Sequence, residues 1–502
     1  MERPVAVHIL VLALVLAYWS IRMIAFSALG GDEAEQVLFA QSFQWGYDVS
    51  NPPLYTWILI VLFTLFGKSA GLVLALKMVV LGLVYVALYQ AARMSLDQER
   101  KLDMALVALS PLLIFFVAWN SIFSYSHGLL NALFVILTYI ATIKAFEDGR
   151  LRWYLVLGLV VGCGVLTKYS YVLFVLGLLG ASLTLPNLRG RLLSFRMLAA
   201  LAISGLVIAP HAWWLLGSVE HVEYAVNSKL QIGDETSYMG GVVKGLWNIV
   251  RALFAFMSPL WIVAFLLFPA LFRPLKKVDA HPFATGLLGR TFLFILAMMV
   301  AMVVVGGITQ FRPNYLFLMI LFPLWVFLRI PPAQAVLDKR RQVYCALVLS
   351  GAVLSVGGLV AKALIDPMRC TKCKYLVPFE DIAQGLQARG FTGGTLFATW
   401  YPVPLAGNLA LYLDEARTVS KKFVAIRPPA RSEPGQCLSV WVPQEQGGPD
   451  TKNAIGSTEG NFNIKIDAQT PVTRLTFPFY RTQNKHIIID YVLLDPGSGD
   501  CK

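Results

Sequence analysis

Eleven long apolar segments fill most of the first 365 residues, and they restrict the possible folds more than any other feature. A helix that crosses a bilayer needs about 20 predominantly apolar residues. Only 14% of the residues are charged, against roughly 25% in soluble domains. We therefore predict a polytopic α-helical membrane protein. The segments are 5–27, 70–93, 102–119, 127–146, 152–168, 170–184, 197–217, 246–272, 290–308, 314–330 and 341–365.

The basic residues predict how these segments are oriented. Lys and Arg cluster in five connections, which all fall on one side if the eleven segments cross the membrane. Such positive connections are typically cytoplasmic. We therefore expect a cytoplasmic N-terminus and place residues 28–50 and 366–502 outside. The same scattered charges account for the net charge of +13 and give no basic domain face, so we expect no nucleic-acid partner.

The apolar segment 52–66 begins with Pro52-Pro53 and is too short to cross a bilayer comfortably. If it did cross, every later basic connection would move to the outside. The charge pattern therefore favours an interfacial or re-entrant half-helix at the membrane surface.

The composition changes at Asp366, after which we find no spanning segment. Short β-rich runs and one helical pattern predict a small α/β domain over 366–502, outside the membrane. Its four cysteines, in an oxidising compartment, predict one or two disulfides of undetermined connectivity, whereas a zinc site would have only His486 to help. The predicted strands are 396–399, 438–442, 474–480 and 487–494, the helix is 379–388, and the cysteines are Cys370, Cys373, Cys437 and Cys501.

Three acids lie close together near the start of the first outer loop: Asp32, Glu33 and Glu35. Carboxylates are costly at a membrane surface unless they bind or activate something. One interpretation is structural, with Asp32 and Glu35 forming a capping box for a helix that runs to Phe43. The other makes Asp32 a general base, and makes Glu33 and Glu35 candidates for binding the acceptor or a metal.

Seven basic or histidine residues fall toward the outer ends of the predicted spans. Snorkelling explains any one of them, but as a set they oppose the positive-inside trend and suggest a shared anionic ligand, such as a phosphate. We single out Lys168 and Arg312, and after them Lys77, as candidates for binding it. The seven are Arg22, Lys77, His127, Lys168, His211, Arg312 and Lys362. Further candidates for lining an outer cavity are Asn51, Tyr55, Asn120, His127 and His211. The outer loop 218–245 is either a mobile lid or a solvated connection.

Two runs carry a resemblance to a known family. Asp32-Glu33-Ala34-Glu35-Gln36 and Asn51-Pro52-Pro53-Leu54-Tyr55-Thr56-Trp57 resemble the GT-C type glycosyltransferases that use polyprenyl-phosphate sugars. The likeness is to the bacterial branch related to protein O-mannosyltransferases. Within it, the rhizobial lipopolysaccharide galacturonosyltransferases look nearer than the aminoarabinose–lipid A transferases. It is clearest over 28–170 and extends weakly to Arg312-Pro313-Asn314 and to Leu405-Ala406-Gly407-Asn408-Leu409-Ala410.

The resemblance implies an enzyme of the bacterial inner membrane with a periplasmic C-terminal domain, surrounded by membrane lipids. It also implies a polyprenyl-phosphate-linked sugar donor, a lipid or glycolipid acceptor such as lipopolysaccharide core or lipid A, and Asp32 as base in an inverting transfer. The chain departs from the aminoarabinose enzymes, which carry Arg in place of Glu35 and a Glu-Lys pair in place of Ser50-Asn51. A divalent metal is possible, and galacturonic acid is one candidate sugar. The alternatives are a transporter or flippase for an anionic lipid, and a polysaccharide ligase.

Overall fold

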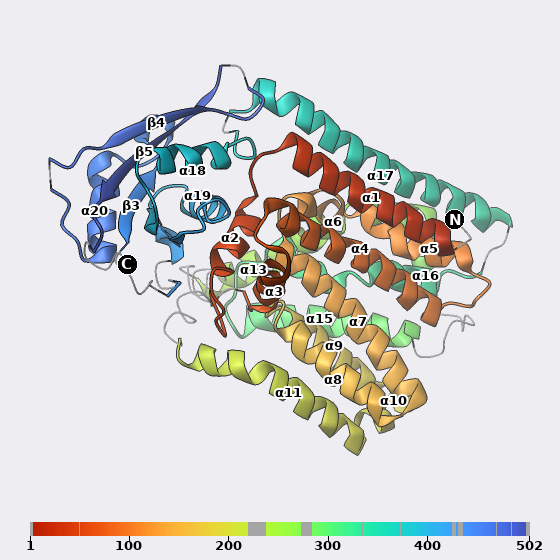
Figure 1. The fold of residues 1–502 in the computed structure, drawn as a ribbon. Helices are drawn as coiled ribbons and strands as arrows, with labels where there is room; N and C mark the ends of the chain where they lie inside the picture. Colours follow the sequence, from red (N-terminus) through yellow and green to blue (C-terminus); the bar gives the residue numbers. More distant parts are fainter. Residues whose placement is uncertain are drawn as a thin grey trace. The chain divides into compact units, whose positions relative to one another are not determined.

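The protein is described by a computed structural model, and residues 1–365 are helical almost throughout (Figure 1). The structure describes residues 4–49, 51–218, 237–272, 284–332, 335–371, 373–423, 428–429, 435–467, 469–482 and 484–497. Most of the outer loop 218–245, which the sequence suggested as a lid, lies outside these residues. The chain groups into two compact units: 1–16, 49–54 and 77–356 form the first, and 17–48, 55–76 and 357–502 form the second.

Seven described helices are long and apolar enough to cross a membrane, and an eighth crossing is possible if the bent pair α9–α10 counts as one. This confirms a polytopic helical membrane protein. The seven are α1 (Pro4–Ala25), α4 (Ala70–Ser95), α7 (Ser126–Asp148), α11 (Phe195–Leu216), α13 (Tyr238–Met257), α15 (Ala284–Val304) and α17 (Ala335–Arg369). The bent pair is α9 (Tyr171–Thr184) with α10 (Pro186–Leu192), at 119°.

The other predicted crossings are shorter or broken, so the described residues do not contain eleven continuous spans. Proline is the physical reason at two of the breaks, because it lacks the N–H that an inner helical turn requires. Pro111 and Pro323 each stand where a new helical piece begins. Segment 102–119 consists of α5 (Lys101–Leu109), η1 (Ser110–Leu113) and α6 (Phe115–Ala118), and segment 314–330 of η4 (Pro313–Met319) and α16 (Phe322–Arg329). Segment 152–168 is α8 (Leu151–Val165), and 246–272 continues beyond α13 as α14 (Leu260–Leu267) and η3 (Pro269–Phe272).

Small residues bring the helices of the first unit close together. Helix α8 packs against α7 and α11, and α9 packs against α15. A Cβ on Gly158 would lie 2.3 Å from the Ala200 carbonyl oxygen, and one on Gly162 would lie 2.8 Å from the Val207 Cβ. Two glycines four residues apart therefore allow α8 and α11 to approach closely, as is common for helix pairs in membranes.

Two of the basic residues in the predicted cytoplasmic connections are buried in an ion-pair cluster. Arg100 Nε and Arg341 Nε donate to the Asp103 carboxylate at 2.8 and 2.6 Å. The Arg100 Nη2 also donates to the backbone oxygens of Phe327 and Ile330. These arginines join α5, α16 and α17 within the first unit, so only part of the positive charge in these connections is available to lipid headgroups.

The orientation itself stays a prediction. With a cytoplasmic N-terminus, we expect reporter fusions at residue 97 to lie inside, and fusions at residue 230 and at the C-terminus to lie outside. Paired alkaline phosphatase and fluorescent-protein fusions would measure each position. A cytoplasmic C-terminal fusion would contradict the prediction and would indicate that 52–66 crosses the membrane.

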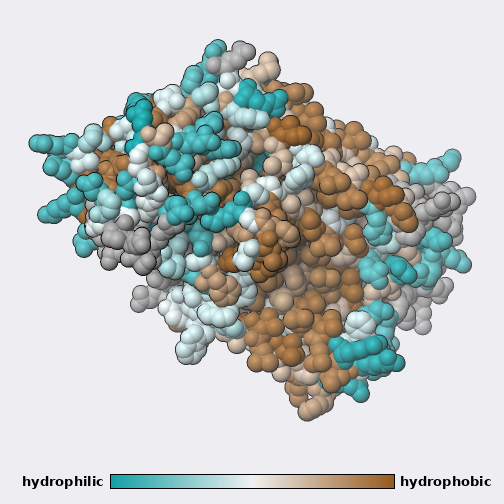
Figure 2. All heavy atoms as spheres, in the orientation of Figure 1, coloured by the Kyte–Doolittle hydropathy of each residue, from teal (hydrophilic) through white to brown (hydrophobic). Residues whose placement is uncertain are grey.

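The C-terminal region forms the predicted α/β domain around a five-stranded mixed sheet in the order β2-β1-β3-β5-β4. Strand β1 pairs in parallel with β2 and β3, while β5 pairs antiparallel with β3 and β4. The strands are β1 (Gly394–Ala398), β2 (Ala416–Ser420), β3 (Gln436–Trp441), β4 (Thr473–Pro478) and β5 (His486–Leu494). In Figure 2, hydrophilic residues gather over this domain and hydrophobic residues over the helices of the membrane region.

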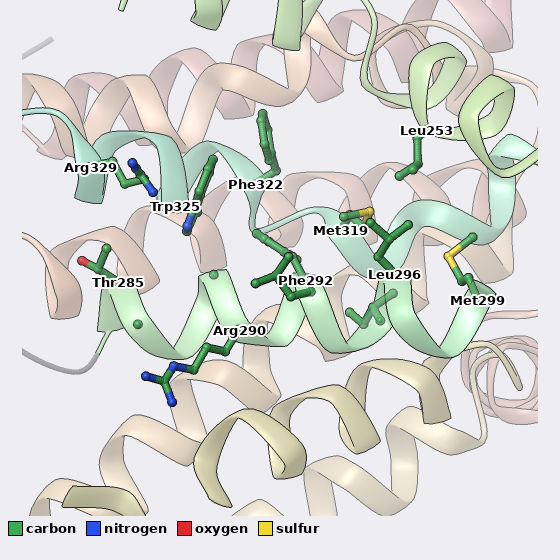
Figure 3. Close-up of a pocket in the computed structure, with 14 residues that line it drawn as sticks. Leu253, Thr285, Arg290, Phe292, Leu296, Met299, Met319, Phe322, Trp325 and Arg329 are labelled. Atoms are coloured by element: carbon green, nitrogen blue, oxygen red, sulfur yellow. The ribbon is translucent and has the colours of Figure 1, made fainter. Parts of the chain in front are cut away.

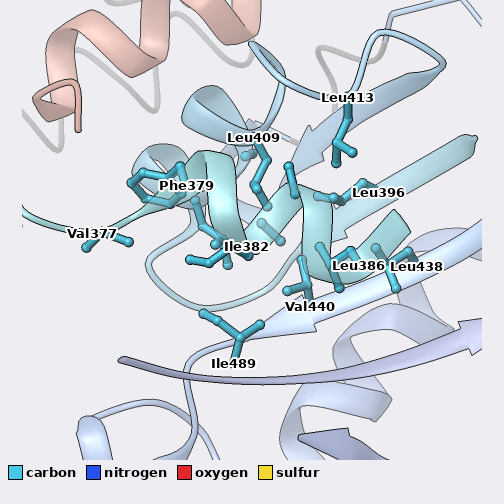
Figure 4. Packing of buried hydrophobic residues seen from close by; sticks show 14 of the residues in the cluster. Val377, Phe379, Ile382, Leu386, Leu396, Leu409, Leu413, Leu438, Val440 and Ile489 are labelled. Carbon is cyan, nitrogen blue, oxygen red and sulfur yellow. The ribbon is translucent and has the colours of Figure 1, made fainter. Parts of the chain in front are cut away.

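Helices cover both faces of this sheet. Helices α18 (Phe379–Ala388) and α19 (Pro402–Leu409) pack on one face, where Ile382 and Leu409 join Leu438 and Ile489 in one buried cluster (Figure 4). Helix α20 (Thr451–Phe462) packs on the other face, with Phe462 against Phe397. The four predicted strands and α18 are present, whereas β2, α19 and α20 were not predicted.

Candidate active site

Helix α2 (Gly31–Phe39) carries Asp32, Glu33 and Glu35, and Glu33 caps its N-terminal end. Gly30 is extended, with φ −69° and ψ 170°, and its N–H donates to Glu33 Oε2 at 2.7 Å. Asp32 occupies the second helical position. The capping-box prediction for Asp32 and Glu35 is therefore wrong in its residues, because the helix begins two positions earlier and Gly30 and Glu33 make the corresponding contact.

Glu33 is also the partner of Arg22, which lies in the last turn of α1. Arg22 Nη2 lies 2.8 Å from Glu33 Oε2, and both side chains are fully buried. The guanidinium carbon lies 5.7 Å from the centroid of the Phe26 ring and 5.4 Å from that of Tyr375. Arg22 therefore serves first as the counter-ion of Glu33.

This arrangement bears on the possible metal site. The Glu33 carboxylate is held by Arg22 and Gly30, and Glu35 lies 3.5 Å from the Lys422 ammonium. Within the described ranges, no three or more His, Cys, Asp or Glu side chains are grouped as metal ligands would be. The acids of α2 therefore fit a resident metal poorly, and we derive no chemical step through one.

Asp32 differs from Glu33 in its surroundings. It is half-buried, and it projects about 100° around the helix from Glu33. Its carboxylate acts electrostatically on Tyr375, a residue that the sequence analysis did not single out. The pKa of Tyr375 is raised to about 12, chiefly by burial. Arg22 opposes this rise, whereas the carboxylates of Glu33, Asp32 and Asp366 contribute to it. Tyr375 is therefore a neutral phenol near Asp32 at neutral pH.

Tyr375 is held by the connection that follows α17. The backbone N–H groups of Ser27 and Ala28 donate to its carbonyl oxygen at 3.0 and 3.2 Å. A disulfide between Cys370 and Cys373 closes the turn just before it. Cys437 is also disulfide-bonded, with its partner outside the described residues. The disulfide prediction is thus confirmed, and the Cys370–Cys373 pair does not form the alternative zinc site.

Helix α19 anchors the other side of the acidic loop. The Asn408 side-chain oxygen accepts from the Leu29 N–H at 2.8 Å, and its Nδ2 donates to the Pro404 oxygen. A Cβ on Gly407 would lie 2.0 Å from the Ala34 carbonyl oxygen, so only glycine lets α19 approach α2 this closely. The weak similarity at 405–410 therefore corresponds to a segment that positions α2.

The half-helix is α3 (Leu54–Phe66), and it is tied to the same loop. Thr56 Oγ1 donates to the Gln36 side-chain oxygen at 2.6 Å, and Trp57 Nε1 donates to the Gln44 carbonyl at 2.8 Å. Tyr55, a predicted cavity residue, is buried. The two motifs that carried the resemblance thus meet through these side chains.

The Arg22–Glu33 pair gives a test of how α2 is held. Arg22→Met would leave Glu33 buried without this partner, and breaking such pairs costs roughly 3–5 kcal/mol. We expect the double variant Arg22→Met/Glu33→Gln to recover much of that loss, since neither buried charge remains. Thermal unfolding of the purified variants in detergent measures both. If the single variant unfolds at the wild-type temperature, the pair does not stabilise this loop.

The predicted phosphate ligands Lys168 and Arg312 belong to the first unit. Lys168 lies between α8 and α9, and its Nζ donates to the Asn314 carbonyl at 2.9 Å and lies 5.4 Å from the centroid of the Tyr315 ring. Arg312 is exposed and immediately precedes η4, which contains Asn314 and Tyr315. The structure thus brings the segments of these two cations together. The N–H of Leu54, next to Pro53, donates to the Leu166 carbonyl beside them.

The remaining predicted residues lie in varied surroundings. Lys77 is fully buried in α4, and His127 is buried in the first turn of α7. His211 is buried, and its Nε2 lies 3.0 Å from the Tyr169 hydroxyl. Asn51 and Asn120 are half-buried. Among the seven basic or histidine residues predicted at the outer ends of the spans, Arg22 pairs with the Glu33 carboxylate and Lys362 with that of Asp366. These two pairs give Arg22 and Lys362 a role that needs no phosphate.

Comparison with known proteins places these features in a family. Residues 50–214 match the family model described as dolichyl-phosphate-mannose-protein mannosyltransferase. The chain is 27% identical to the lipopolysaccharide core galacturonosyltransferase RgtA of Rhizobium johnstonii, over 84% of this chain and 83% of RgtA. It is 26% identical to RgtB of the same organism, over 70% of this chain and 72% of RgtB.

The fold also matches a solved structure along almost its full length. The crystal structure of ArnT from Cupriavidus metallidurans bound to undecaprenyl phosphate superposes with a TM-score of 0.58 at 13% identity, covering 97% of this chain and 98% of ArnT. At this identity the match concerns the fold alone. The sequence matches identify this chain as a membrane glycosyltransferase of the GT-C type, related to the protein mannosyltransferases, and its fold agrees with them.

Proposed function

We propose that this enzyme transfers a sugar from a polyprenyl-phosphate donor to lipopolysaccharide, on the core or on lipid A, at the outer face of the bacterial inner membrane. The observation that carries the proposal is the similarity to RgtA, a core galacturonosyltransferase, over more than four fifths of both chains. The ArnT structure, with its bound undecaprenyl phosphate, supports a lipid-phosphate donor.

The proposed reaction is a single displacement at the anomeric carbon of the donor sugar. Asp32 takes the proton of the acceptor hydroxyl as that oxygen bonds to the anomeric carbon. The bond from that carbon to the phosphate oxygen breaks, and its electron pair leaves with the polyprenyl phosphate. Lys168 and Arg312 stabilise the charge that develops on that phosphate. One displacement by the acceptor hydroxyl inverts the anomeric centre. One carboxylate base therefore suffices, and the enzyme does not need to supply a nucleophilic side chain.

The choice of Asp32 as the base follows from the different contacts of the three acids of α2. Glu33 is neutralised by Arg22 and used to close the helix, and Glu35 lies near Lys422. Asp32 is partly exposed on a helix that is fixed by Asn408, Gly407 and Thr56. A base must be held still while one oxygen stays within reach of the acceptor, and Asp32 meets both conditions better than Glu33.

Mass spectrometry tests the proposed function. Lipopolysaccharide and polyprenyl-phosphate sugars would be compared between cells with and without this protein. We expect one sugar, with galacturonic acid as the first candidate, to disappear from the core or lipid A of the deletion strain while its polyprenyl-phosphate donor accumulates. Unchanged lipopolysaccharide and donor pools would contradict the proposal. No observation specifically favours a flippase or a ligase.

A further inference from the structure

An apolar groove of about 530 Å³ lies between α15, α16 and α13 in the first unit. Its walls include Leu253, Phe292, Leu296, Met299 and Phe322 (Figure 3). The volume is within the range of roughly 300–1,000 Å³ that is typical of small-molecule pockets. Leu293, on the same wall, is 66% exposed, so the groove opens on the apolar surface of a membrane helix.

Two arginines mark one end of this groove. Arg329, in the last turn of α16, and Trp325 lie at the end opposite Leu253 and Met299 (Figure 3). The Arg329 guanidinium carbon lies 5.2 Å from the centroid of the Trp325 ring, and Nη2 donates to the Leu271 carbonyl at 3.1 Å. Arg290, from the second turn of α15, is exposed and donates to the Thr184 carbonyl. Among the described lining residues of the groove, the charged ones are these two arginines.

The dimensions match a single lipid chain. The groove follows α15 from Thr285 to Met299, which spans about 21 Å at 1.5 Å per residue. One leaflet contributes roughly 15 Å of hydrocarbon, half of a bilayer core about 30 Å thick. Gly286 and Gly289 form part of the wall, and a Cβ on Gly289 would lie only 3.0 Å from Trp325 Nε1. The glycine therefore leaves room for the indole ring at the charged end.

We infer that this groove binds an anionic glycerophospholipid, with an acyl chain along α15 and its phosphate at Arg329. Basic pockets between membrane helices are suited to such headgroups. Arg329 already stacks on Trp325, which orients its fork for a bidentate contact with phosphate. Under the predicted orientation, both arginines lie at the cytoplasmic ends of their helices. The occupant is thus a lipid of the inner leaflet, distinct from the outer-face donor.

Native mass spectrometry of the purified, delipidated full-length protein tests this inference. It would be titrated with phosphatidylglycerol or phosphatidylcholine of identical acyl chains. We expect the wild type to prefer phosphatidylglycerol by about tenfold, the size of one charge-assisted hydrogen bond. Arg329→Gln should remove most of this preference, whereas Gly289→Leu, which fills the groove, should reduce binding of both lipids.

The controls separate this site from general charge and from folding. Arg196→Gln removes an exposed arginine at the start of α11 and should leave the preference unchanged. Thermal unfolding shows whether each variant remains folded, and if Gly289→Leu does not, Gly286→Leu replaces it. Equal binding of the two lipids by the wild type, an unchanged preference in Arg329→Gln, or displacement of phosphatidylglycerol by polyprenyl phosphate would overturn the inference.

Discussion

We expect Asp32→Asn to reduce sugar transfer by about 100- to 10,000-fold, the range typical for loss of a general base. The amide has the size and shape of the carboxylate but does not accept the proton of the acceptor hydroxyl. Because Glu33 closes the helix through Gly30, stability should change by no more than about 1 kcal/mol, the size of a charge–dipole interaction in a first helical turn. Turnover of purified enzyme with donor and acceptor measures the loss.

A matched control is available on the same loop. Asp48→Asn also removes a carboxylate from residues 28–50 but lies outside α2, and we expect it to keep near-normal turnover. Thermal unfolding of both variants confirms that they are folded. Near-wild-type turnover in Asp32→Asn would remove Asp32 from the catalytic role and leave the acids of α2 with a structural one.

The apolar pattern correctly predicted that the membrane region is helical, but it did not predict where the helices are interrupted. Seven helices in the expected regions are long and apolar enough to cross a membrane, because long apolar runs have few alternatives there. Two of the interrupted segments contain Pro111 or Pro323, and a hydropathy pattern does not register the breaks at these prolines. In the C-terminal domain, the four predicted strands are rich in β-branched, aromatic and other apolar residues, and α18 is amphipathic. The sequences of β2 and α20 are mostly polar and give no such signal, although Val419 and Phe462 pack in the core.

In the candidate site too, the features set by neighbouring residues were predicted, whereas contacts between distant residues were not. The spacing of Asp32, Glu33 and Glu35 is local, so the sequence predicted a helix beginning there. Which acid closes it depends on the backbone at Gly30, and which acid is neutralised depends on Arg22 in another helix. Tyr375, which interacts electrostatically with Asp32, lies more than 340 residues after it in the sequence. Contacts of this kind leave no periodic signal in a single sequence.

The phosphate-binding role of Lys168 and Arg312 gives the second large expected effect. Lys168 is mostly buried, and its ammonium lies against the Asn314 carbonyl and the Tyr315 ring, whereas Arg312 is exposed at the start of the same segment. The ammonium carries three donors, and one of them is given to the Asn314 carbonyl. A charge-assisted hydrogen bond contributes about 1.5–3 kcal/mol, which corresponds to roughly 10- to 150-fold in affinity.

Lys168→Ala and Arg312→Ala should therefore each weaken binding of the polyprenyl-phosphate sugar by about tenfold or more. Arg312→Lys should recover only part of the Arg312→Ala loss, because a point charge does not reproduce the bidentate guanidinium fork. Arg152→Ala, which removes an exposed cation from the predicted cytoplasmic start of α8, should leave donor binding unchanged. Donor titration at fixed acceptor gives the apparent affinity and rate of each variant. If both Ala variants match the wild type, these cations only snorkel to the membrane surface, and the leaving phosphate is stabilised by other residues.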